Sequence, residues 1–482
     1  MSESKMRVAV VGAGAAGSAA AYRLWQKLGH AVSITVYERK EHVGGRAWDL
    51  QFAGTRIEVG GTLLHSSGRY TMELMEFTGS QAGGSGLSID GKNETYAFWT
   101  GKGFVVTTRT SLQSMAANIL RYVGLGSARR VVSSATGMAS KWERVYDLLG
   151  SGQTFTTPQA LLEELGLREA TQLSLASYLG KLGANRRMTH DIVEPIIHNM
   201  YNQGAEIGAL AGLVGLAGAG LAGGYLFAIE DGNWTIYDKT LAKIGADLRL
   251  NTQVTAIEML SGSSAHGEGD LNGDELGGAG ETREGADAAG GVGAGGARTC
   301  CAVTTADGAS EYYDAVILAA PLALADLELR ANGAPLDATV YPYQEVQTTL
   351  VVGTLNPAFF GADPRKRLPS TVFTADSAGA PFKSIGVTGH SPTYDSRIYK
   401  IFSADHEMTD EELGRIFSTI HDVHRFVWRG AYPVISPDID HLPFELAPGL
   451  FYACAFETAA GAIEVESVAG YNTANLLAQY LT

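Results

Sequence analysis

The start of the chain alternates short apolar runs with a stretch of small residues. Residues 8–11 are all apolar and predict a buried strand, residues 15–28 predict an alanine-rich helix, and residues 34–37 predict a second strand. A strand, a helix and a strand in this order form one βαβ unit. We therefore expect an α/β fold.

The rest of the chain predicts a mostly helical region and then a return to strands. Residues 87–225 favour helices, with the clearest expected over 111–123, 140–149, 158–165 and 173–182. After residue 230, helices are expected over 235–244 and 467–480, and strands over 248–250, 253–259, 314–320, 348–352 and 450–454.

The length of 482 residues is too great for one hydrophobic core. We predict an α/β domain built from residues 1–85, 226–330 and 430–482, and a second, α+β domain built from residues 86–225, which are mostly helical, and 331–429. Residues 261–296 are dominated by Gly, Ala, Glu and Asp, and they cannot bury enough apolar surface to order themselves. They predict a disordered hairpin insertion.

Composition and charge exclude several classes of protein. Apolar residues make up 45% of the chain and charged residues 18%, which is ordinary for a globular protein. The formal net charge of −15 would repel phosphate backbones, so nucleic acid is not expected as a partner. Cys300, Cys301 and Cys454 give no CxxC spacing and no set of metal ligands, so no metal site is expected.

Two apolar stretches resemble targeting or membrane segments. Residues 8–21 follow Lys5 and Arg7 as in a signal peptide, but they also supply a glycine fingerprint that a mature protein has to keep. Residues 207–225 are uncharged but rich in Gly and Ala, and they predict a buried helix with a glycine-rich exit. We expect no transmembrane segment and a cytoplasmic or otherwise soluble location.

The glycine fingerprint is Gly12-x-Gly14-x-x-Gly17, between the first strand and the helix. Gly12 permits the tight turn, Gly14 lets a pyrophosphate approach the backbone, and Gly17 lets the helix pack on the strand. The free amides of the helix N-terminus favour the phosphate charge. Glu38 follows the second strand, where an acidic side chain binds ribose hydroxyls. The pattern predicts dinucleotide binding.

A second motif, Glu38-Arg39 with Val43-Gly44-Gly45-Arg46, resembles that of the glutathione-reductase-type FAD superfamily, which includes amine oxidases. The resemblance implies an FAD-binding Rossmann domain, with the second domain binding the substrate. The guanidinium group of Arg46 would donate hydrogen bonds to the pyrophosphate or to a neighbouring carbonyl. Residues 59–61 and His65 correspond to a loop near the flavin ring.

The C-terminal segment resembles the motif that covers the flavin in this superfamily. Its backbone at 461–464 is the expected contact, whereas Glu457 and Glu464 could instead be solvated carboxylates at a helix start. The resemblance implies the following cofactor-binding residues: Gly12, Gly14, Ala15, Ala16, Gly17, Glu38, Arg39, Gly44, Gly45, Arg46, Gly60, Gly61, Val254, Gly461, Ile463 and Glu464.

A narrower resemblance covers nearly the whole chain apart from the insertion. The chain resembles the prenylcysteine oxidase and farnesylcysteine lyase family in the strings at 199–203, 229–233, 313–321, 348–352, 383–386, 399–403 and 428–433. This implies a thioether oxidase that uses FAD, O2 and water to convert prenylcysteine into a prenyl aldehyde, free cysteine and H2O2, with hydride transfer from the allylic carbon to flavin N5. A lipid substrate also allows peripheral contact with a membrane.

His65, Tyr201, Asn202 and Gln203 are the candidates for positioning substrate or water during catalysis. The chain departs from the family in two places. It has Met-Tyr-Asn-Gln at 200–203 where the family has Asn-Tyr-Gly-Gln, so other prenyl thioethers and related lipids stay open as substrates. Animal members of the family carry an N-terminal signal and act in lysosomes, whereas this sequence starts almost directly at its first strand, so we keep the lysosome or vacuole only as the alternative that the resemblance implies.

Two other functions stay open. An amine oxidase or desaturase acting on another lipid would share the FAD motifs, although Ala462-Ile463 replaces the aromatic residue usual beside the flavin of amine oxidases. A non-catalytic prenyl carrier of the GDP-dissociation-inhibitor type shares the architecture but has no working flavin. The complete fingerprint favours an enzyme.

Overall fold

The computed structural model describes residues 5–83, 95–107, 112–260, 300–403 and 405–482. The expected insertion at 261–296 and the expected domain boundary at residue 85 lie outside these residues.

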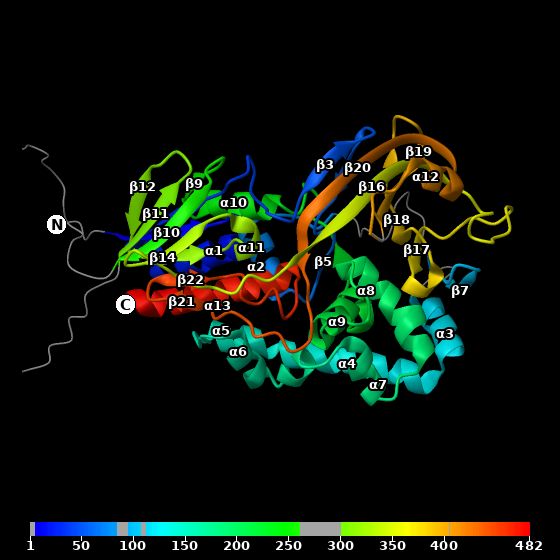
Figure 1. The fold of residues 1–482 in the computed structure, drawn as a ribbon, viewed down its shortest axis with the longest axis horizontal. Coiled ribbons are helices and arrows are strands. Elements are labelled where there is room, and N and C mark those ends of the chain that lie inside the picture. Colours follow the sequence, from blue (N-terminus) through cyan, green and yellow to red (C-terminus); the bar gives the residue numbers. More distant parts are fainter. Residues whose placement is uncertain (1–4, 84–94, 108–111, 261–299, 404) are drawn as a thin grey trace, which may run out of the picture.

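A six-stranded sheet forms the centre of the α/β region on the left of Figure 1. Its order is β21 (Glu445–Ala447), β22 (Leu450–Tyr452), β13 (Ala315–Leu318), β1 (Met6–Val11), β2 (Val32–Tyr37) and β9 (Asp247–Arg249). All neighbouring pairs are parallel except β21 with β22. A parallel sheet has to be covered on both faces, which explains the continuous apolar runs of β1 and β13. The predicted α/β class is confirmed.

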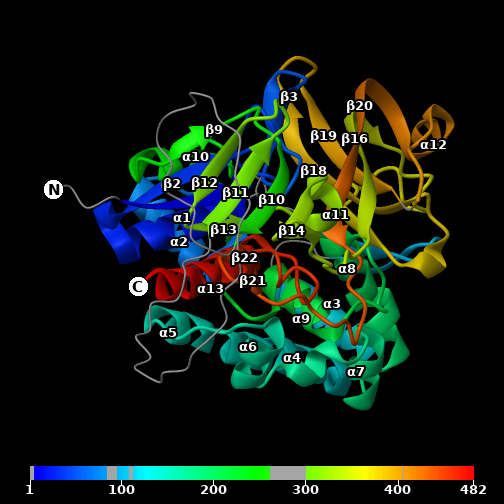
Figure 2. The same ribbon diagram turned by 60° about the vertical axis from the view of Figure 1, so that its left-hand side comes forward.

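Helices and a second sheet surround the six-stranded sheet. The helices are α1 (Ala15–Leu28), α2 (Arg69–Thr78), α10 (Thr235–Lys243), α11 (Leu322–Ala325) and α13 (Ile463–Leu481), and the five-stranded sheet consists of β12 (Ser310–Tyr313), β11 (Cys300–Thr305), β10 (Val254–Leu260), β14 (Glu328–Ala331) and β15 (Ala334–Pro335). In Figures 1 and 2, α13 lies between the six-stranded sheet and the helices α5 (Arg144–Gly150) and α6 (Pro158–Leu165).

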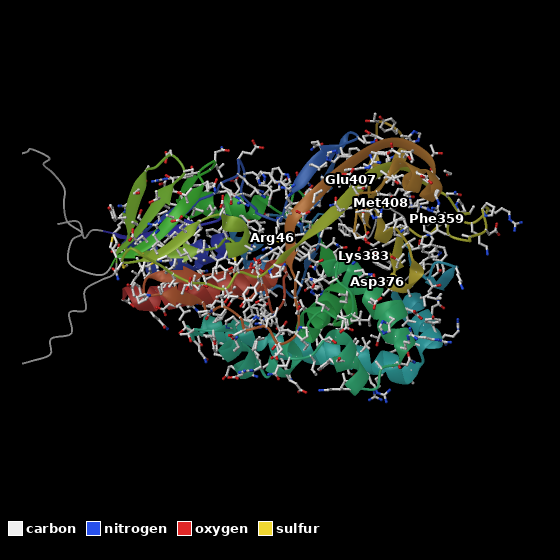
Figure 3. All side chains as sticks on the ribbon, in the orientation of Figure 1. Arg46, Phe359, Asp376, Lys383, Glu407 and Met408 are labelled. Carbon is white, nitrogen blue, oxygen red and sulfur yellow. The ribbon has the colours of Figure 1, made fainter. Side chains whose placement is uncertain are left out.

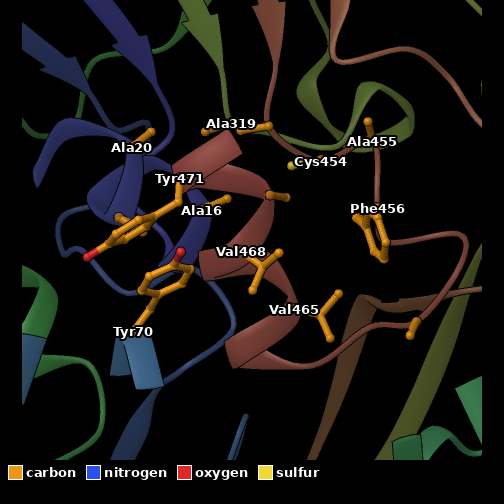
Figure 4. Packing of buried hydrophobic residues seen from close by; sticks show 14 of the residues in the cluster. Ala16, Ala20, Tyr70, Ala319, Cys454, Ala455, Phe456, Val465, Val468 and Tyr471 are labelled. Carbon is orange, nitrogen blue, oxygen red and sulfur yellow. The ribbon is translucent and has the colours of Figure 1, made fainter. Parts of the chain in front are cut away.

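Small residues bring α13 against α1. A Cβ atom added at Gly470 would come within 2.3 Å of the Ala16 carbonyl oxygen, so only glycine permits this approach. Nearby, the rings of Tyr70 and Tyr471 stack with their centres 3.5 Å apart (Figure 4). The last helix is thus part of the core around the first.

A seven-stranded sheet forms the upper right of Figure 1. Its order is β20 (Phe417–Pro433), β16 (Tyr343–Leu355), β19 (Ser396–Ser403), β18 (Phe382–Ser391), β17 (Thr371–Thr374), β6 (Tyr96–Trp99) and β7 (Phe104–Thr107). Helix α12 (Asp410–Ile416) begins with a capping box between Thr409 and Glu412 and leads into β20. Two short ribbons, β3 (Asp49–Phe52) with β4 (Thr55–Glu58) and β5 (Leu64–His65) with β8 (Leu226–Phe227), lie towards the centre.

A helical layer forms the lower part of the molecule. Besides α5 and α6 it contains α3 (Leu112–Val123), α4 (Leu125–Trp142), α7 (Leu175–Lys181), α8 (Glu194–Tyr201) and α9 (Ala209–Leu216), with π-helical turns at Arg187–Val193 and Ala217–Leu221. The single helix expected over 140–149 is wrong, since α4 ends there and α5 begins. The expected buried helix within 207–225 is confirmed as α9. Among the described residues, no helix is both long and apolar enough to span a bilayer.

Candidate functional site

A continuous cavity of about 1060 Å³ connects the α/β region with the second sheet and the helical layer. One end is lined by the turn after β1 and by Glu38, and the middle is lined by Gly44–Ala47 and Glu58–His65. The other end is lined by the last turn of α8, by β17 to β19 and by α9. The cavity therefore places the glycine fingerprint and the second region around one space.

The fingerprint turn has the geometry of a dinucleotide cradle. Gly12 has φ 109°, and a Cβ there would come within 2.6 Å of the Ala319 carbonyl oxygen. Helix α1 begins at Ala15, and Gly14 before it has no side chain to cap the helix, so the first amides are available to an anion. Glu38 is buried and accepts hydrogen bonds from the amides of Ala13 and Lys40, each at 3.0 Å. Its carboxylate is thus held beside the turn.

The other expected cofactor-binding residues gather around this turn. Gly45 lies against Gly14, and a Cβ at Gly60 would overlap the Arg46 carbonyl oxygen at 1.9 Å. A Cβ at Gly61 would come within 2.8 Å of Ile463 Cδ1. All of the expected residues line the cavity except Gly17, whose Cβ would come within 2.0 Å of the Gly12 carbonyl oxygen. Segments from the N-terminal and C-terminal parts of the chain therefore meet around the glycine turn.

The Arg46 side chain points to Glu457 (Figure 3 shows its position where the two regions meet). Its Nη2 forms an ion pair with one Glu457 oxygen, and Nη1 lies 3.4 Å from the other and 3.5 Å from the Ala431 carbonyl oxygen. The Tyr343 hydroxyl also donates to Glu457, whose side chain is only 1% exposed. The alternative of a solvated Glu457 is wrong, because this carboxylate is buried and paired.

Glu466 lies beside this pair and has no hydrogen-bond partner within the described structure. Burial and the neighbouring charge of Glu457 raise the pKa of Glu466 well above its ordinary value. The neutral form of Glu466 is therefore favoured, and Arg46 pairs with Glu457.

Glu464 caps the N-terminus of α2. It accepts hydrogen bonds from the amides of Tyr70 and Thr71, both at 2.9 Å, and from the hydroxyls of Thr71 and Tyr146 at 2.6 and 2.9 Å. The alternative of a solvated Glu464 is also wrong, because α2 has no capping side chain of its own and Glu464 supplies the acceptor from α13.

The four catalytic candidates occupy different surroundings. His65 lines the cavity, and its Nδ1 and Nε2 lie 2.7 Å from Ser67 Oγ and 2.8 Å from the Gly223 carbonyl oxygen. Tyr201 and Asn202 line the opposite end, at the C-terminus of α8. Gln203 lies outside the cavity lining, where its amide bonds to the Pro433 carbonyl oxygen and the Ile435 amide. Their catalytic roles stay predictions.

Sequence reasoning did not find Lys400, whose amine faces the cavity from β19. Its Nζ donates to the Glu58 carbonyl oxygen at 3.2 Å and to Thr62 Oγ1 at 2.7 Å. Burial lowers the pKa of Lys400 to about 8, opposed by the charge of Glu58. The string 399–403 contains it, but nothing in that string separates it from a solvated lysine.

Two groups of side chains in the described part of the chain have the chemistry of metal ligands: Glu194, His198 and Asp376, and Cys454, Glu457 and Glu466. In the first group, His198 Nε2 lies 3.3 Å from Asp376, and its Nδ1 lies 2.9 Å from the Thr374 carbonyl oxygen. In the second, Arg46 and Tyr343 already occupy Glu457. These interactions involve Glu457, His198 and Asp376, whereas both Glu466 oxygens lack a hydrogen-bond partner among the described residues.

Comparisons with known proteins agree with this geometry. The family model described as "Prenylcysteine lyase" matches residues 107–482, and that of an NAD(P)-binding Rossmann-like domain matches residues 10–77. The farnesylcysteine lyase of Arabidopsis thaliana is 27% identical, and the prenylcysteine oxidase 1 of Mus musculus is 25% identical; each alignment covers 98% of this chain and 88% of the relative.

Solved structures of low sequence identity share the fold. The cyclohexylamine oxidase of Brevibacterium oxydans IH-35A aligns with a TM-score of 0.59 and 16% identity, over 99% of this chain and 100% of that one. A fatty acid isomerase of P. acnes aligns with a TM-score of 0.57 and 15% identity, over 100% of both chains. Proteins that share this fold are thus named for amine and for fatty acid substrates. The substrate of this chain therefore has to be argued from the site.

Proposed function

The chain belongs to the prenylcysteine lyase family, and on that premise we propose that it is an FAD-dependent oxidoreductase that cleaves S-prenylcysteine into a prenyl aldehyde and free cysteine. The observation that carries the proposal is the continuous cavity that runs from the dinucleotide cradle to a chamber between the second sheet and the helical layer. A cofactor and a long apolar substrate can share such a space.

The residues of the cradle fit FAD. Gly12, Gly14 and Gly45 line the cavity, the amides at the start of α1 favour the charge of a pyrophosphate, and Glu38 is held where a ribose would need an acceptor. When bound, FAD accepts two electrons from the substrate and passes them to O2, which yields H2O2.

The chain's own residues shape the chamber. Met200, Val214 and Leu226 provide apolar surface for an isoprenoid chain, and the rings of Tyr201 and Tyr432 meet edge to face with centres 5.5 Å apart. Burial raises the pKa of both tyrosines, so their hydroxyls stay protonated donors. Such a chamber excludes bulk water from the oxidised substrate, which has to react with one water molecule only.

The test is an anaerobic titration of the purified protein with farnesylcysteine, followed by flavin absorbance. We expect the flavin bands to bleach, and free thiol, farnesal and H2O2 to form when air is readmitted. S-Methylcysteine, which has no allylic carbon, is the control and should leave the flavin oxidised. A yellow protein that never bleaches refutes the substrate and directs the search to other lipids and amines. A colourless protein refutes the FAD assignment and favours a prenyl carrier.

We also infer that O2 is the physiological acceptor and that the substrate reaches the cavity from a membrane surface. The lipid nature of prenylcysteine supports the second point. A cytoplasmic location is our expectation, with the lysosome or vacuole as the alternative. Flotation with liposomes and fluorescence microscopy of the tagged protein test these two points.

A further inference from the structure

The amine of Lys400 has a defined orientation. Thr62 Oγ1 donates its own hydrogen to the Gly60 carbonyl oxygen at 3.0 Å, so towards Lys400 it can act only as an acceptor. The Glu58 carbonyl oxygen is an acceptor as well. A neutral amine has two N–H groups, and these two partners use both. The lone pair of neutral Lys400 is left for a third direction, and Lys400 lines the cavity.

The loop that holds Lys400 is itself held by Asn233, which is fully buried. The side-chain amide of Asn233 donates to the carbonyl oxygens of Gly61 and Thr62 at 2.7 and 3.0 Å and accepts from the Ile229 amide at 2.8 Å. Its backbone amide donates to the Glu58 carboxylate at 2.9 Å. Every polar group of Asn233 except its backbone carbonyl thus holds in place either residues 58–62 or the turn that begins at Ile229.

We propose that Lys400 accepts the proton of the water that adds to the oxidised substrate, and that Asn233 is the positioning residue that orients Lys400 through Glu58 and Thr62. The inference rests on the proposed function. Before the step, the carbon next to sulfur has been oxidised by loss of a hydride, which bound FAD would accept. Water then forms a C–O bond to that carbon and one of its protons goes to Lys400 Nζ. The C–S bond of the hemithioacetal then breaks as the hydroxyl proton passes to sulfur, which gives aldehyde and thiol.

The charged surroundings of Lys400 set the expected pH dependence. Glu58, at the end of β4, is the charged side chain that acts on it, and Asp49 and Arg56 act on Glu58. Burial raises the pKa of Glu58 to about 7. Because only the neutral amine can accept a proton, turnover should rise as the pH increases through about 8. Competitive acetylation of the holoenzyme with acetic anhydride, read by mass spectrometry at Lys400, should show the same midpoint without measuring activity.

The first variant is Lys400→Met, which keeps the length of the side chain. We expect anaerobic flavin reduction by farnesylcysteine to stay within about threefold of wild type, while release of farnesal falls ~100-fold, a typical loss for a missing base. Release of farnesal at the wild-type rate with an unchanged pH profile would overturn the role of Lys400. Failure of the wild-type enzyme to bleach would instead refute the proposed function.

Asn233→Ala tests the positioning role, with Asn472→Ala as its matched control. Asn472 is equally buried and bonds only to the backbone of Phe155, away from the cavity. Both variants should lose stability, but only Asn233→Ala should move the pH midpoints of turnover and of Lys400 acetylation. Equal midpoints in the two variants would overturn the positioning role.

Thr62→Val gives a second test if Asn233→Ala does not fold. Loss of the Oγ1 acceptor removes a partner that favours the charged amine, so both midpoints should move to lower pH. Thr62→Ser keeps the acceptor and should restore the wild-type midpoints. If Thr62→Val and Thr62→Ser titrate alike, the geometry assigned to Lys400 is wrong.

Discussion

Removal of Arg46 should damage the protein even before cofactor binding is considered. Arg46→Ala leaves the Glu457 carboxylate, 1% exposed, with no counter-charge and with Glu466 beside it. Breaking one partner out of a buried ion pair costs about 3–5 kcal/mol. Because the Arg46 side chain is 33% exposed to the cavity, we take the low end, about 3 kcal/mol.

The cost should depend on pH in a defined direction. In the variant, two adjacent buried carboxyl groups have no cation beside them, so their charged forms are disfavoured in the folded state and the variant loses stability as the pH rises. Its deficit relative to wild type should therefore be largest near pH 7–8 and shrink towards pH 5, where neutral carboxyl groups need no counter-charge. Equilibrium unfolding in urea across this range, on protein freed of flavin, measures the deficit.

The double variant Arg46→Ala/Glu457→Gln separates the two roles of Arg46. Glutamine keeps the size of the glutamate and removes its charge, so the double variant should regain most of the lost stability but still retain FAD poorly. A flavin-free Arg46→Ala protein within about 0.5 kcal/mol of wild type at pH 7.5 would refute the electrostatic argument. Full flavin occupancy of Arg46→Ala would remove its cofactor role.

Three further predictions follow from burial and packing. Gly470→Val should unfold the α1–α13 contact, because its Cβ would overlap the Ala16 carbonyl oxygen at 2.3 Å, and circular dichroism should show a large loss of thermal stability. Burial lowers the pKa of His441 to about 4, so stability present above pH 6.5 should fall by about 3 kcal/mol as the pH drops to 4, and His441→Gln should lose that dependence in unfolding measurements. Gly218→Leu should raise KM for geranylgeranylcysteine more than for farnesylcysteine, because Gly218 lines the cavity and its Cβ meets nothing within 4 Å. Gly137→Leu, the same change on the outer face of α4, should leave both KM values unchanged, and a Gly218→Leu enzyme with unaltered selectivity would show that the prenyl chain lies elsewhere.

Local pattern predicted the cofactor half of the fold well. The helix expected over 15–28 is α1 to the residue, because Gly14 and Gly29 flank an alanine-rich run in which Gly17 is the weakest helix former. The strand expected over 348–352 is only the middle of β16, which runs from Tyr343 to Leu355. Its partner β20 escaped notice because most of its seventeen residues are at least partly exposed, so no apolar alternation marks it.

The site was predictable where a motif exists and hidden where only the fold brings residues together. The glycine turn and Glu38 are local, so a pattern can reveal them. Glu457 meets Arg46 across 411 positions of sequence, and Lys400 meets Thr62 across 338. Residues so far apart in sequence leave no periodic pattern from which their contact could be predicted. The division of the chain into five segments stays a prediction, since part of its evidence lies outside the described residues.

The packing of α13 on α1 has a consequence for biosynthesis. A ribosome makes the fingerprint helix, which ends at Leu28, long before Ile463, where its partner begins, leaves the exit tunnel. Until then the apolar face of α1 and the amides at the start of α2 lack the side chains that cover and cap them. We therefore expect the nascent chain to expose this surface to chaperones until α13 is made. Because residues 461–464 also line the cavity, we expect the cofactor site to be complete only after synthesis ends.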